Sequence, residues 1–205
     1  MRRSIGWGLL LAVWSWLGIG ELGAQSWNFV KQKDGVSIYT RKEENSPLKA
    51  FKGVMELRAD LEKVYLLVAD AQNFNGWDKS IRDIRLLAYE KDKFSLYYLI
   101  YDLPWPLTDR DICAEARIEI DEGSGQRIIA SRSLPERVPE KPHMVRIRRY
   151  WQRWTLQSLA AGTLRITLEG FADPAGSVPS WLYNMVIVDT PLKLMREIRK
   201  RLEGK

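Results

Sequence analysis

Residues 81–173 consist of strand-like segments joined by short turns, and this succession constrains the fold more than any other feature of the sequence. Within residues 111–120, the apolar Ile112, Ala114 and Ala116 alternate with mostly charged side chains. An alternation of period two is typical of a strand that buries one face and exposes the other. The joints DEGSG and LAAG are typical of hairpin turns. The pattern therefore predicts an antiparallel meander.

Earlier residues extend the same sheet. Two further strands are predicted at residues 35–41 and 48–58. Residues 59–70 then change to helical spacing, with Asp60 as the predicted N-cap. Trp77 follows in a turn region and is expected to return to the core. The chain thus builds two strands and one helix before the meander begins.

The C-terminal segment is the large element left to cover the apolar face of this sheet. Ser177 is predicted to cap a long helix, and Pro179 is predicted to lie in its first turn. The predicted fold class is therefore α+β, with a curved antiparallel β-sheet wrapped around a long C-terminal α-helix. The apolar residues of the helix recur at intervals of three and four and form one predicted stripe: Val178, Trp181, Met185, Val188, Leu192, Met195, Ile198 and Leu202.

The middle of this helix is built from poor helix formers. Val186, Ile187, Val188 and Thr190 are β-branched, and Pro191 has no N–H to donate to the carbonyl of Ile187. A proline in a helix interior costs about 3 kcal/mol relative to a good helix former. We expect a kink at this point, which lets the N-terminal half of the helix move while the C-terminal half stays packed.

A single cysteine, Cys113, and a single histidine, His143, limit the chemistry of the chain. A disulfide within the chain is excluded, and so is a zinc site built from several Cys and His ligands. His143 lies in a proline-rich loop, where we expect an exposed side chain without a functional role. No catalytic residue, metal site or cofactor is predicted.

The chain carries a formal net charge of +6. Much of the surplus lies in residues 146–153 and 193–205, which we interpret as a solvated strand face and a helix end that favours positive charge. Transient contact with an anionic membrane surface is consistent with this charge. Nucleic-acid binding is not predicted, because no recognised binding motif is present. We expect a single domain that is a monomer.

Residues 1–24 are predicted to be a targeting segment rather than part of the folded domain. Two arginines precede an apolar run at residues 5–19, and small residues follow before Gln25. This order is typical of a secretory signal peptide. We expect cleavage after Ala24, export to the periplasm or the extracellular space, and a mature domain at residues 25–205. An uncleaved membrane anchor is the alternative.

Two motifs distinguish the chain. The stretch LPWPLTDRD at residues 103–111 joins a proline-containing loop to an Arg-Asp pair at the start of a strand, and DPAGSVPSWLYN at residues 173–184 leads into the closing helix. In this order, and with Trp77 after the first helix, they resemble the START family, the lipid-transfer domains related to steroidogenic acute regulatory protein. This family belongs to the larger helix-grip group. The resemblance spans residues 27–202.

The resemblance implies an internal apolar cavity between the sheet and the terminal helix. It also implies that this cavity holds one lipid or other hydrophobic small molecule, which the protein carries or senses without covalent chemistry. Small side chains on an inner face, such as Ala114 and Ala116, leave either a ligand volume or room for close helix packing. The residues expected to bind lipid are Tyr98, Ile100, Ala114, Ala116, Arg149, Trp151, Ile166, Leu168, Met185, Val188 and Leu192.

Charged residues are few near the predicted cavity. Sterol-binding relatives carry a buried arginine on the strand after the Arg-Asp pair, matched by an acid on the preceding strand. The corresponding positions here are Ala116 and the region of Tyr97 and Tyr98, so no such ion pair is available. Arg149 lies two residues before Trp151, so in a regular strand both side chains would point to the same face of the sheet. It faces either the cavity, where it would need a ligand acid, a phosphate or water, or the solvent if a bulge interrupts the strand.

Two other functions are compatible with the sequence. Helix-grip relatives include polyketide cyclases and aromatases, which use the same cavity for acid-base chemistry. Against this alternative, the predicted inner faces are mainly aliphatic and aromatic. Arg110 and Asp111 are strand neighbours that point to opposite faces, and we interpret them as structural. The other alternative is a membrane-docking module that uses its basic helix end and has an incidental cavity.

Overall fold

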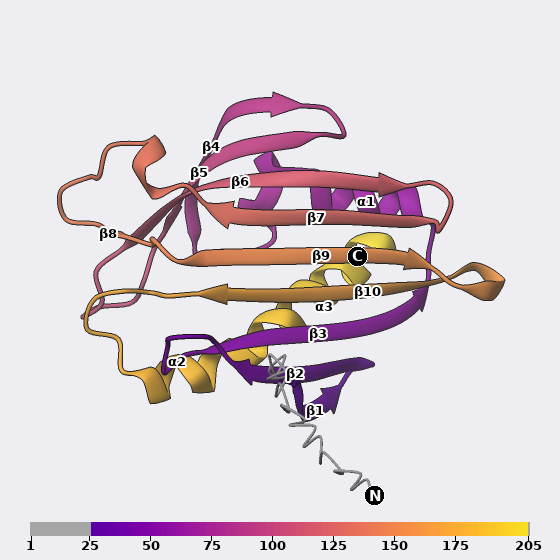
Figure 1. Cartoon of the computed structure of the whole chain (residues 1–205), viewed down its shortest axis with the longest axis horizontal. Coiled ribbons are helices and arrows are strands. Elements are labelled where there is room, and N and C mark those ends of the chain that lie inside the picture. Colours follow the sequence, from indigo (N-terminus) through magenta and orange to yellow (C-terminus); the bar gives the residue numbers. More distant parts are fainter. Residues whose placement is uncertain (1–25, 205) are drawn as a thin grey trace, which may run out of the picture.

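The computed structural model of the protein describes residues 26–204. Its strands are β1 (Asn28–Lys33), β2 (Val36–Lys42), β3 (Lys49–Arg58), β4 (Ile81–Glu90), β5 (Phe94–Tyr101), β6 (Arg110–Asp121), β7 (Gln126–Ser133), β8 (Val145–Arg146), β9 (Tyr150–Ser158) and β10 (Thr163–Ala172). They form one sheet in the order β1-β2-β3-β10-β9-β7-β6-β5-β4 (Figure 1). Neighbours in this order are antiparallel, and β8 pairs with β6 in parallel.

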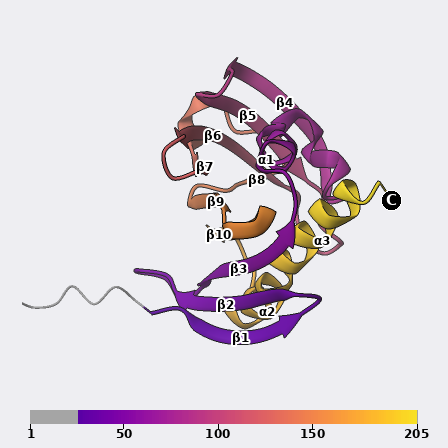
Figure 2. The same cartoon turned by 90° about the vertical axis from the view of Figure 1, so that its right-hand side faces the viewer.

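The helices lie on one side of this sheet. They are α1 (Leu61–Ala69), α2 (Ser180–Val186) and α3 (Thr190–Leu202). The 3-10 turns are η1 (Ala71–Gly76), η2 (Pro135–Arg137), η3 (Ala160–Gly162) and η4 (Ile187–Asp189). Figure 2 shows the sheet curving around α3, with α1 on the same concave side. The expected α+β fold, a curved antiparallel sheet wrapped around a C-terminal helical segment, is confirmed.

The early elements also agree with the sequence. The Asp60 carboxylate accepts a hydrogen bond of 2.9 Å from the backbone N–H of Lys63 and caps α1 as predicted. Trp77 is buried against the main core. The strand β1 was not predicted, because its side chains are nearly all exposed and give no alternation.

Residues 143–159, which lie within the strand-like region predicted from the sequence, do not form one continuous strand. β8 pairs with the start of β6, and residues 147–149 between β8 and β9 are irregular. The alternation of inward and outward side chains therefore does not continue from β8 into β9. Arg149 lies within the interruption and is exposed.

The C-terminal helix is divided where its composition predicts weakness. α2 ends at Val186, one 3-10 turn follows, and α3 begins at Thr190. The backbone N–H of Thr190 donates to the carbonyl of Ile187, so the acceptor that Pro191 leaves without a donor is satisfied. Pro191 lies in the first turn of α3, where a missing N–H costs nothing, and the expected penalty of about 3 kcal/mol does not apply.

The start of this helical segment differs from the prediction. The N-cap of α2 is Pro179 and no side chain caps it, so Ser177 does not have the predicted role. Within α2, Tyr183 is buried, whereas Trp181 and Met185 are 68% and 59% exposed. The single predicted stripe is wrong in α2, because a 3-10 turn has a different angular step and shifts the helical phase between α2 and α3.

The helix α3 approaches the sheet most closely at a glycine of β3. A Cβ atom on Gly53 would lie 2.6 Å from the Cβ of Pro191 and 3.3 Å from the Cε of Met195. Any larger side chain at this position would overlap the first turn of α3. Glycine is therefore required here by close packing rather than by an unusual backbone angle.

A second, smaller core lies behind the sheet. Leu96, Tyr98 and Ile100 of β5 form it together with Cys113 of β6. Partly buried residues of the segment 134–144 pack against this cluster. As a result, β5 is buried on both of its faces.

Candidate functional site

A cavity of about 290 Å³ lies between the concave face of the sheet and the helical segments. One wall comes from the sheet, and the opposite wall comes from α1, η1, η4 and α3. Most of the lining is aliphatic or aromatic, as is typical of sites that bind small apolar molecules. The aromatic lining residues are Phe51, Phe74, Trp77, Tyr97, Tyr101, Tyr150, Trp151, Trp154 and Phe171.

Strand register determines which residues of β5 reach this cavity. Tyr97 lies directly opposite Ala114 of β6, and Leu99 lies opposite Ile112. Directly opposed residues of an antiparallel pair share one face of the sheet. Tyr97, Leu99 and Tyr101 therefore face the cavity together with the inner residues of β6.

The structure contradicts the expected placement of Tyr98 and Ile100. Both side chains are buried in the small core behind the sheet, on the face away from the cavity. The sequence analysis assigned the wrong face of β5 to the cavity. Every residue of β5 is apolar or buried, so no alternation of polar and apolar residues shows which face points inward. The inward residues are their neighbours Tyr97 and Leu99.

Most of the other expected binding residues lie in or against the main core. Trp151 borders the cavity, and its indole N–H donates to Glu43 Oε1 at 3.1 Å. Ala116 borders a much smaller space beneath α1. Five further residues do not border the main cavity. Four of them are buried in the core, namely Ala114, Ile166, Leu168 and Leu192. The fifth, Val188, is half-buried and packs against the core.

Two expected binding residues lie on the surface. Met185 is exposed because of the phase shift between α2 and α3, and the residues of η4 and α3 that border the cavity are Ile187, Thr190 and Leu194 instead. Arg149 is exposed, donates to the carbonyl of Glu44 at 3.1 Å and does not face the cavity.

Asp78 and Arg110 carry the formal charges in the lining of this cavity. Asp78 Oδ1 accepts hydrogen bonds from Lys193 Nζ at 2.6 Å and from the Ser80 hydroxyl at 2.6 Å. Although burial opposes it, these bonds lower the pKa of Asp78 below its usual range. Arg110 donates to the carbonyls of Thr108, Pro174 and Ala175. Both charged groups are thus already bonded within the protein.

Asp111 points to the opposite face from Arg110, as strand alternation requires, and forms a buried ion pair with Arg146. Arg146 Nε donates to Asp111 Oδ1 at 2.8 Å, and one terminal nitrogen donates to Oδ2 at 2.9 Å. The Tyr98 hydroxyl also donates to Oδ2 at 2.7 Å. Arg146 further binds three carbonyls of residues 135–139. The interpretation of Arg146 as part of a solvated strand face is therefore wrong.

A cluster of hydroxyl groups in the cavity was not predicted. Tyr97, Tyr101, Tyr150 and Gln152 all border the cavity, and the Tyr150 hydroxyl donates to Gln152 Oε1 at 3.3 Å. Burial is the main cause that raises the pKa of Tyr97, Tyr101 and Tyr150 above the usual range, so all three stay protonated at neutral pH. The sequence shows only that these strands contain several tyrosines, and it does not show that their side chains border the same cavity.

The part of the chain that the structure describes contains no grouping of His, Cys, Asp and Glu side chains that could hold a metal ion. Over the same residues, no helix is long and apolar enough to cross a membrane.

The chain is similar to several known proteins. It is 30% identical over 184 residues to an uncharacterized protein of Pseudomonas aeruginosa, with 90% of each covered. It is 29% identical over 172 residues to the phosphatidylcholine transfer protein of Bos taurus, with 80% of this chain and 78% of that protein covered.

A solved structure and a family model agree with these relatives. The crystal structure of a STAR-related lipid transfer protein fragment from Xanthomonas axonopodis is 32% identical, covers 86% of this chain and 98% of that one, and superposes with a TM-score of 0.78. The family model described as START domain matches residues 20–204. With a match over nearly the whole described length, this chain belongs to the START domain family.

Proposed function

We propose that this domain binds a single lipid in the cavity between the sheet and α3 and carries it between membranes, without covalent chemistry. START domains are lipid-binding and lipid-transfer domains, and the similar proteins include lipid transfer proteins. The observation that carries the proposal is a cavity with mainly aliphatic and aromatic walls. Such walls favour apolar ligands because contact removes apolar surface from water on both sides.

The energetics of this cavity suit reversible exchange. Moving one methylene from water into an apolar site contributes about 0.8 kcal/mol. A lipid that passes from a bilayer into the cavity leaves one apolar environment for another, so these terms nearly cancel. Uptake and release can then both proceed near equilibrium, as a carrier requires.

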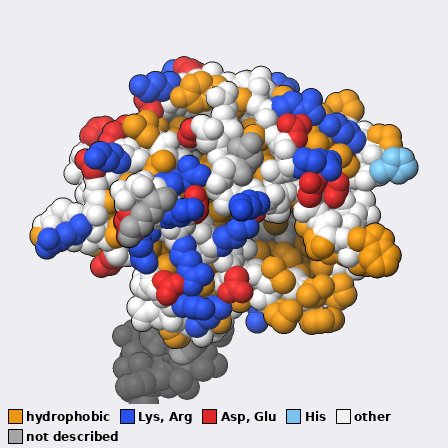
Figure 3. All heavy atoms as spheres, turned by 180° about the vertical axis from the view of Figure 1, so that it is seen from behind, with side chains coloured by type: hydrophobic (Ala, Val, Ile, Leu, Met, Phe, Trp, Pro, Cys, Tyr) orange, Lys and Arg blue, Asp and Glu red, His pale blue; other side chains and the backbone are white. Residues whose placement is uncertain are grey.

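Exposed apolar side chains lie in two segments of the chain that also contribute residues to the cavity lining or directly precede them. Leu103 and Pro174 line the cavity from two loops, and Trp105 beside them is 93% exposed. Trp181 and Met185 of α2 are exposed as well. Figure 3 shows hydrophobic side chains gathered at one end, at the lower right, which is the end where Figure 1 places α2. Exposed apolar patches of this kind suit a membrane interface, and we propose that this end docks on the bilayer.

The basic residues of α3 contribute less to docking in this proposal. Arg196 forms an ion pair with Asp34, and Arg201 pairs with Glu197 at 2.9 Å and donates to the carbonyl of Gly76 at 2.7 Å. Much of the positive charge is therefore balanced within the protein. Docking through the helix end alone, with an incidental cavity, is the less supported alternative.

The alternative of an acid-base enzyme lacks a suitable pair of groups in the described cavity lining. Asp78 is held by Lys193 and Ser80, and Arg110 is held by backbone carbonyls. The buried tyrosines stay protonated, which makes them poor general bases. These observations support a binding function.

Export of a monomeric mature domain is a further part of the proposal. It rests on the sequence pattern of residues 1–24, which lie outside the described residues. Mass spectrometry of the protein from its host should find a chain that begins at Gln25. An intact Met1 would contradict cleavage.

Native mass spectrometry of protein purified from its host, followed by organic extraction, tests the carrier proposal. We expect one bound lipid per chain. A protein that is repeatedly empty and takes up neither fluorescent fatty acids nor sterols would defeat the proposal.

Transfer between donor and acceptor vesicles tests the docking end. Trp105→Ala and Trp181→Ala should slow transfer and weaken vesicle sedimentation without lowering stability, because both side chains are exposed. Tyr89→Ala is the matched control, since Tyr89 is 55% exposed on the edge strand β4 and does not line the cavity. Equal transfer rates for all three variants and the wild-type protein would contradict docking at this end.

A further inference from the structure

Strand β1 forms an open edge of the sheet. It pairs with β2 on one side and ends the strand order, so the backbone groups on its other side have no strand partner among the described residues. Two of its apolar side chains are open to solvent as well, because Phe29 is 60% exposed and Val30 is 43% exposed. An edge with unpaired N–H and C=O groups can accept an extended peptide as a further strand.

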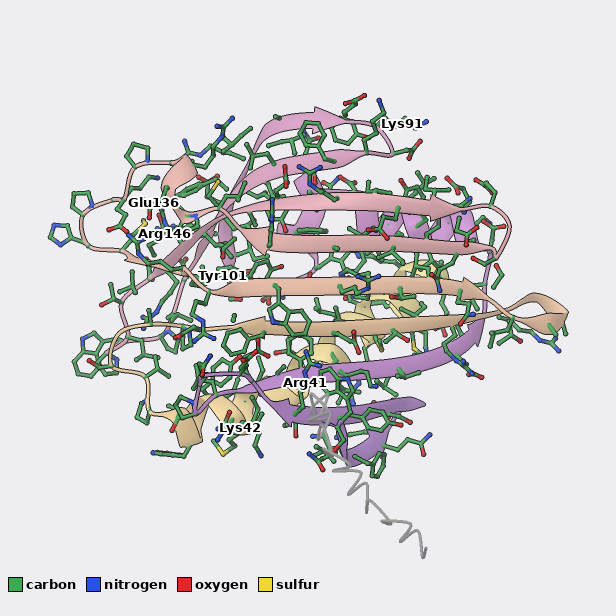
Figure 4. The ribbon with its side chains drawn as sticks, in the orientation of Figure 1. Arg41, Lys42, Lys91, Tyr101, Glu136 and Arg146 are labelled. Atoms are coloured by element: carbon green, nitrogen blue, oxygen red, sulfur yellow. The ribbon has the colours of Figure 1, made fainter. Side chains whose placement is uncertain are left out.

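Beside this edge, two indole rings flank an arginine on the outer face of the sheet. Tyr39 and Arg41 alternate with buried residues of β2 and therefore point outward, and the Tyr39 ring lies 5.6 Å from the ring of Phe29. The guanidinium carbon of Arg41 lies 4.6 Å from the ring centre of Trp27 and 5.5 Å from that of Trp151. Figure 4 labels Arg41 at the side of the sheet where Figure 1 places β2. The Arg41 cluster consists of Trp27, Tyr39, Arg41, Lys52 and Trp151.

The positive charges of the Arg41 cluster have no carboxylate partner. Arg41 forms neither a hydrogen bond nor an ion pair with any residue that the structure describes, and Lys52 likewise lies over the Trp27 ring without an ion pair to a described residue. The neighbouring Glu43 accepts from the indole N–H of Trp151 at 3.1 Å instead. A guanidinium that is held by aromatic rings keeps its N–H groups available, so a carboxylate from outside can form charge-assisted hydrogen bonds with it.

The shape and charge of β1 favour a single extended segment as the occupant over a second copy of the chain. The register with β2 shifts between Phe29 and Lys31, and a bulge of this kind twists an edge and disfavours pairing between two sheets. β1 also carries Lys31 and Lys33, so two copies of it would bring positive charges together. A bilayer, in turn, has no row of backbone groups that could pair with this edge.

We propose that β1 and the Arg41 cluster form a docking site for an extended acidic segment of a partner protein. The segment adds to β1 as a further strand, packs an apolar side chain against Phe29 and places a carboxylate on Arg41. Trp, Tyr and Arg are also the residue types that carry most of the binding energy in protein interfaces. The site lies outside the cavity and does not depend on the carrier function.

Titration of the protein purified from its host with labelled octapeptides tests this docking site. The probes are a peptide of alternating Glu and Val, its counterpart with Lys in place of Glu, and one with Pro in place of Val, which cannot pair as a strand because proline has no N–H. Fluorescence anisotropy reports binding. We expect the Glu-Val peptide to bind at least about tenfold more tightly than the other two and to protect amides of β1 from hydrogen exchange.

Variants on the outer face separate this docking site from general charge attraction. Arg41→Gln should weaken binding of the Glu-Val peptide about tenfold, and Arg41→Lys should restore only part of it, because lysine keeps the charge but not the planar fork. Phe29→Ser should weaken it as well, without loss of folding, since the side chain is exposed. Arg165→Gln is the matched control, because it removes the same charge from the same face at β10, where Arg165 pairs with Glu56 at 2.7 Å.

The outcomes decide the proposal. Absence of binding, equal binding of the three peptides, or unchanged binding of the Glu-Val peptide to Arg41→Gln would overturn the docking site. Phosphatidylglycerol vesicles that bind through Arg41 while the peptide does not would overturn it too, because the surface would then serve a membrane. The carrier function is tested separately by lipid extraction and stands or falls independently of these results.

Discussion

Replacing Gly53 with alanine tests how closely the terminal helix must sit on the sheet. In a strand interior this exchange normally stabilises by roughly 0.5–1 kcal/mol, because glycine loses more backbone entropy on folding. Here the new methyl group would lie 2.6 Å from the Cβ of Pro191, well inside ordinary van der Waals contact. Pro191 is buried and has a rigid ring, so relief requires a shift of α3 or of β3.

The expected size of the effect follows from these two opposing terms. Overpacking a well-packed core costs about 1–3 kcal/mol. After the entropic gain is subtracted, we expect Gly53→Ala to lower the free energy of unfolding by about 1–2 kcal/mol. For a chain of this size, the melting temperature should fall by about 2–8 °C.

Urea denaturation followed by tryptophan fluorescence measures this loss. Gly123→Ala serves as the control, because its new Cβ would meet Asp121 Oδ1 at 3.4 Å, an ordinary contact. The control should stay within about 0.5 kcal/mol of the wild-type protein. If Gly53→Ala is as stable as the wild-type protein or more stable, close packing of α3 is not the reason for glycine at this position.

Three further predictions concern buried charge, pH and the anchoring of α2. Asp111→Ala should lower the free energy of unfolding by about 3–5 kcal/mol, because Arg146 is left charged and buried. Glu56→Gln breaks an exposed ion pair and should cost at most about 1 kcal/mol. Similar losses for the two variants would refute the claim that the buried pair matters more than the exposed one. Burial alone would raise the pKa of Asp111, but its hydrogen bonds hold the pKa below the usual range. Its stabilising effect is therefore complete above the unfolded-state pKa of about 4 and is lost as the pH falls further, so Asp111→Asn should flatten the acid limb of the stability curve. Asn184→Ala removes two hydrogen bonds to residues 47–49 and should speed lipid exchange at a cost of about 1 kcal/mol, whereas an unchanged exchange rate would argue against α2 as a moving part.

The fold was predictable from the sequence because most strands have one solvent-exposed and one buried face. The clear alternation in β6 and the hairpin joints around it give strand limits close to those observed. An edge strand such as β1 exposes nearly all its side chains, so no alternation marks it. The interruption between β8 and β9 likewise has no sign in the order of polar and apolar residues in that segment.

The site was predicted less well than the fold, and for physical reasons. β5 reads LYYLIY over most of its length, and both faces are buried, so only its register with β6 shows that Tyr97 faces the cavity. The helical stripe misassigned Met185 because one 3-10 turn rotates α2 relative to α3. Both errors involve relations between distant segments, which local periodicity does not contain.

The small core behind β5 has a mechanical consequence for the cavity. The sheet wall is supported from outside by residues 134–144, which Arg146 fastens to Asp111. The facing wall at η4 and α3 has no comparable second core behind it among the described residues. Strain from a bulky ligand is therefore relieved on the helical side, so the compliance of that side, rather than the shape of the sheet, sets the largest molecule that the protein can enclose.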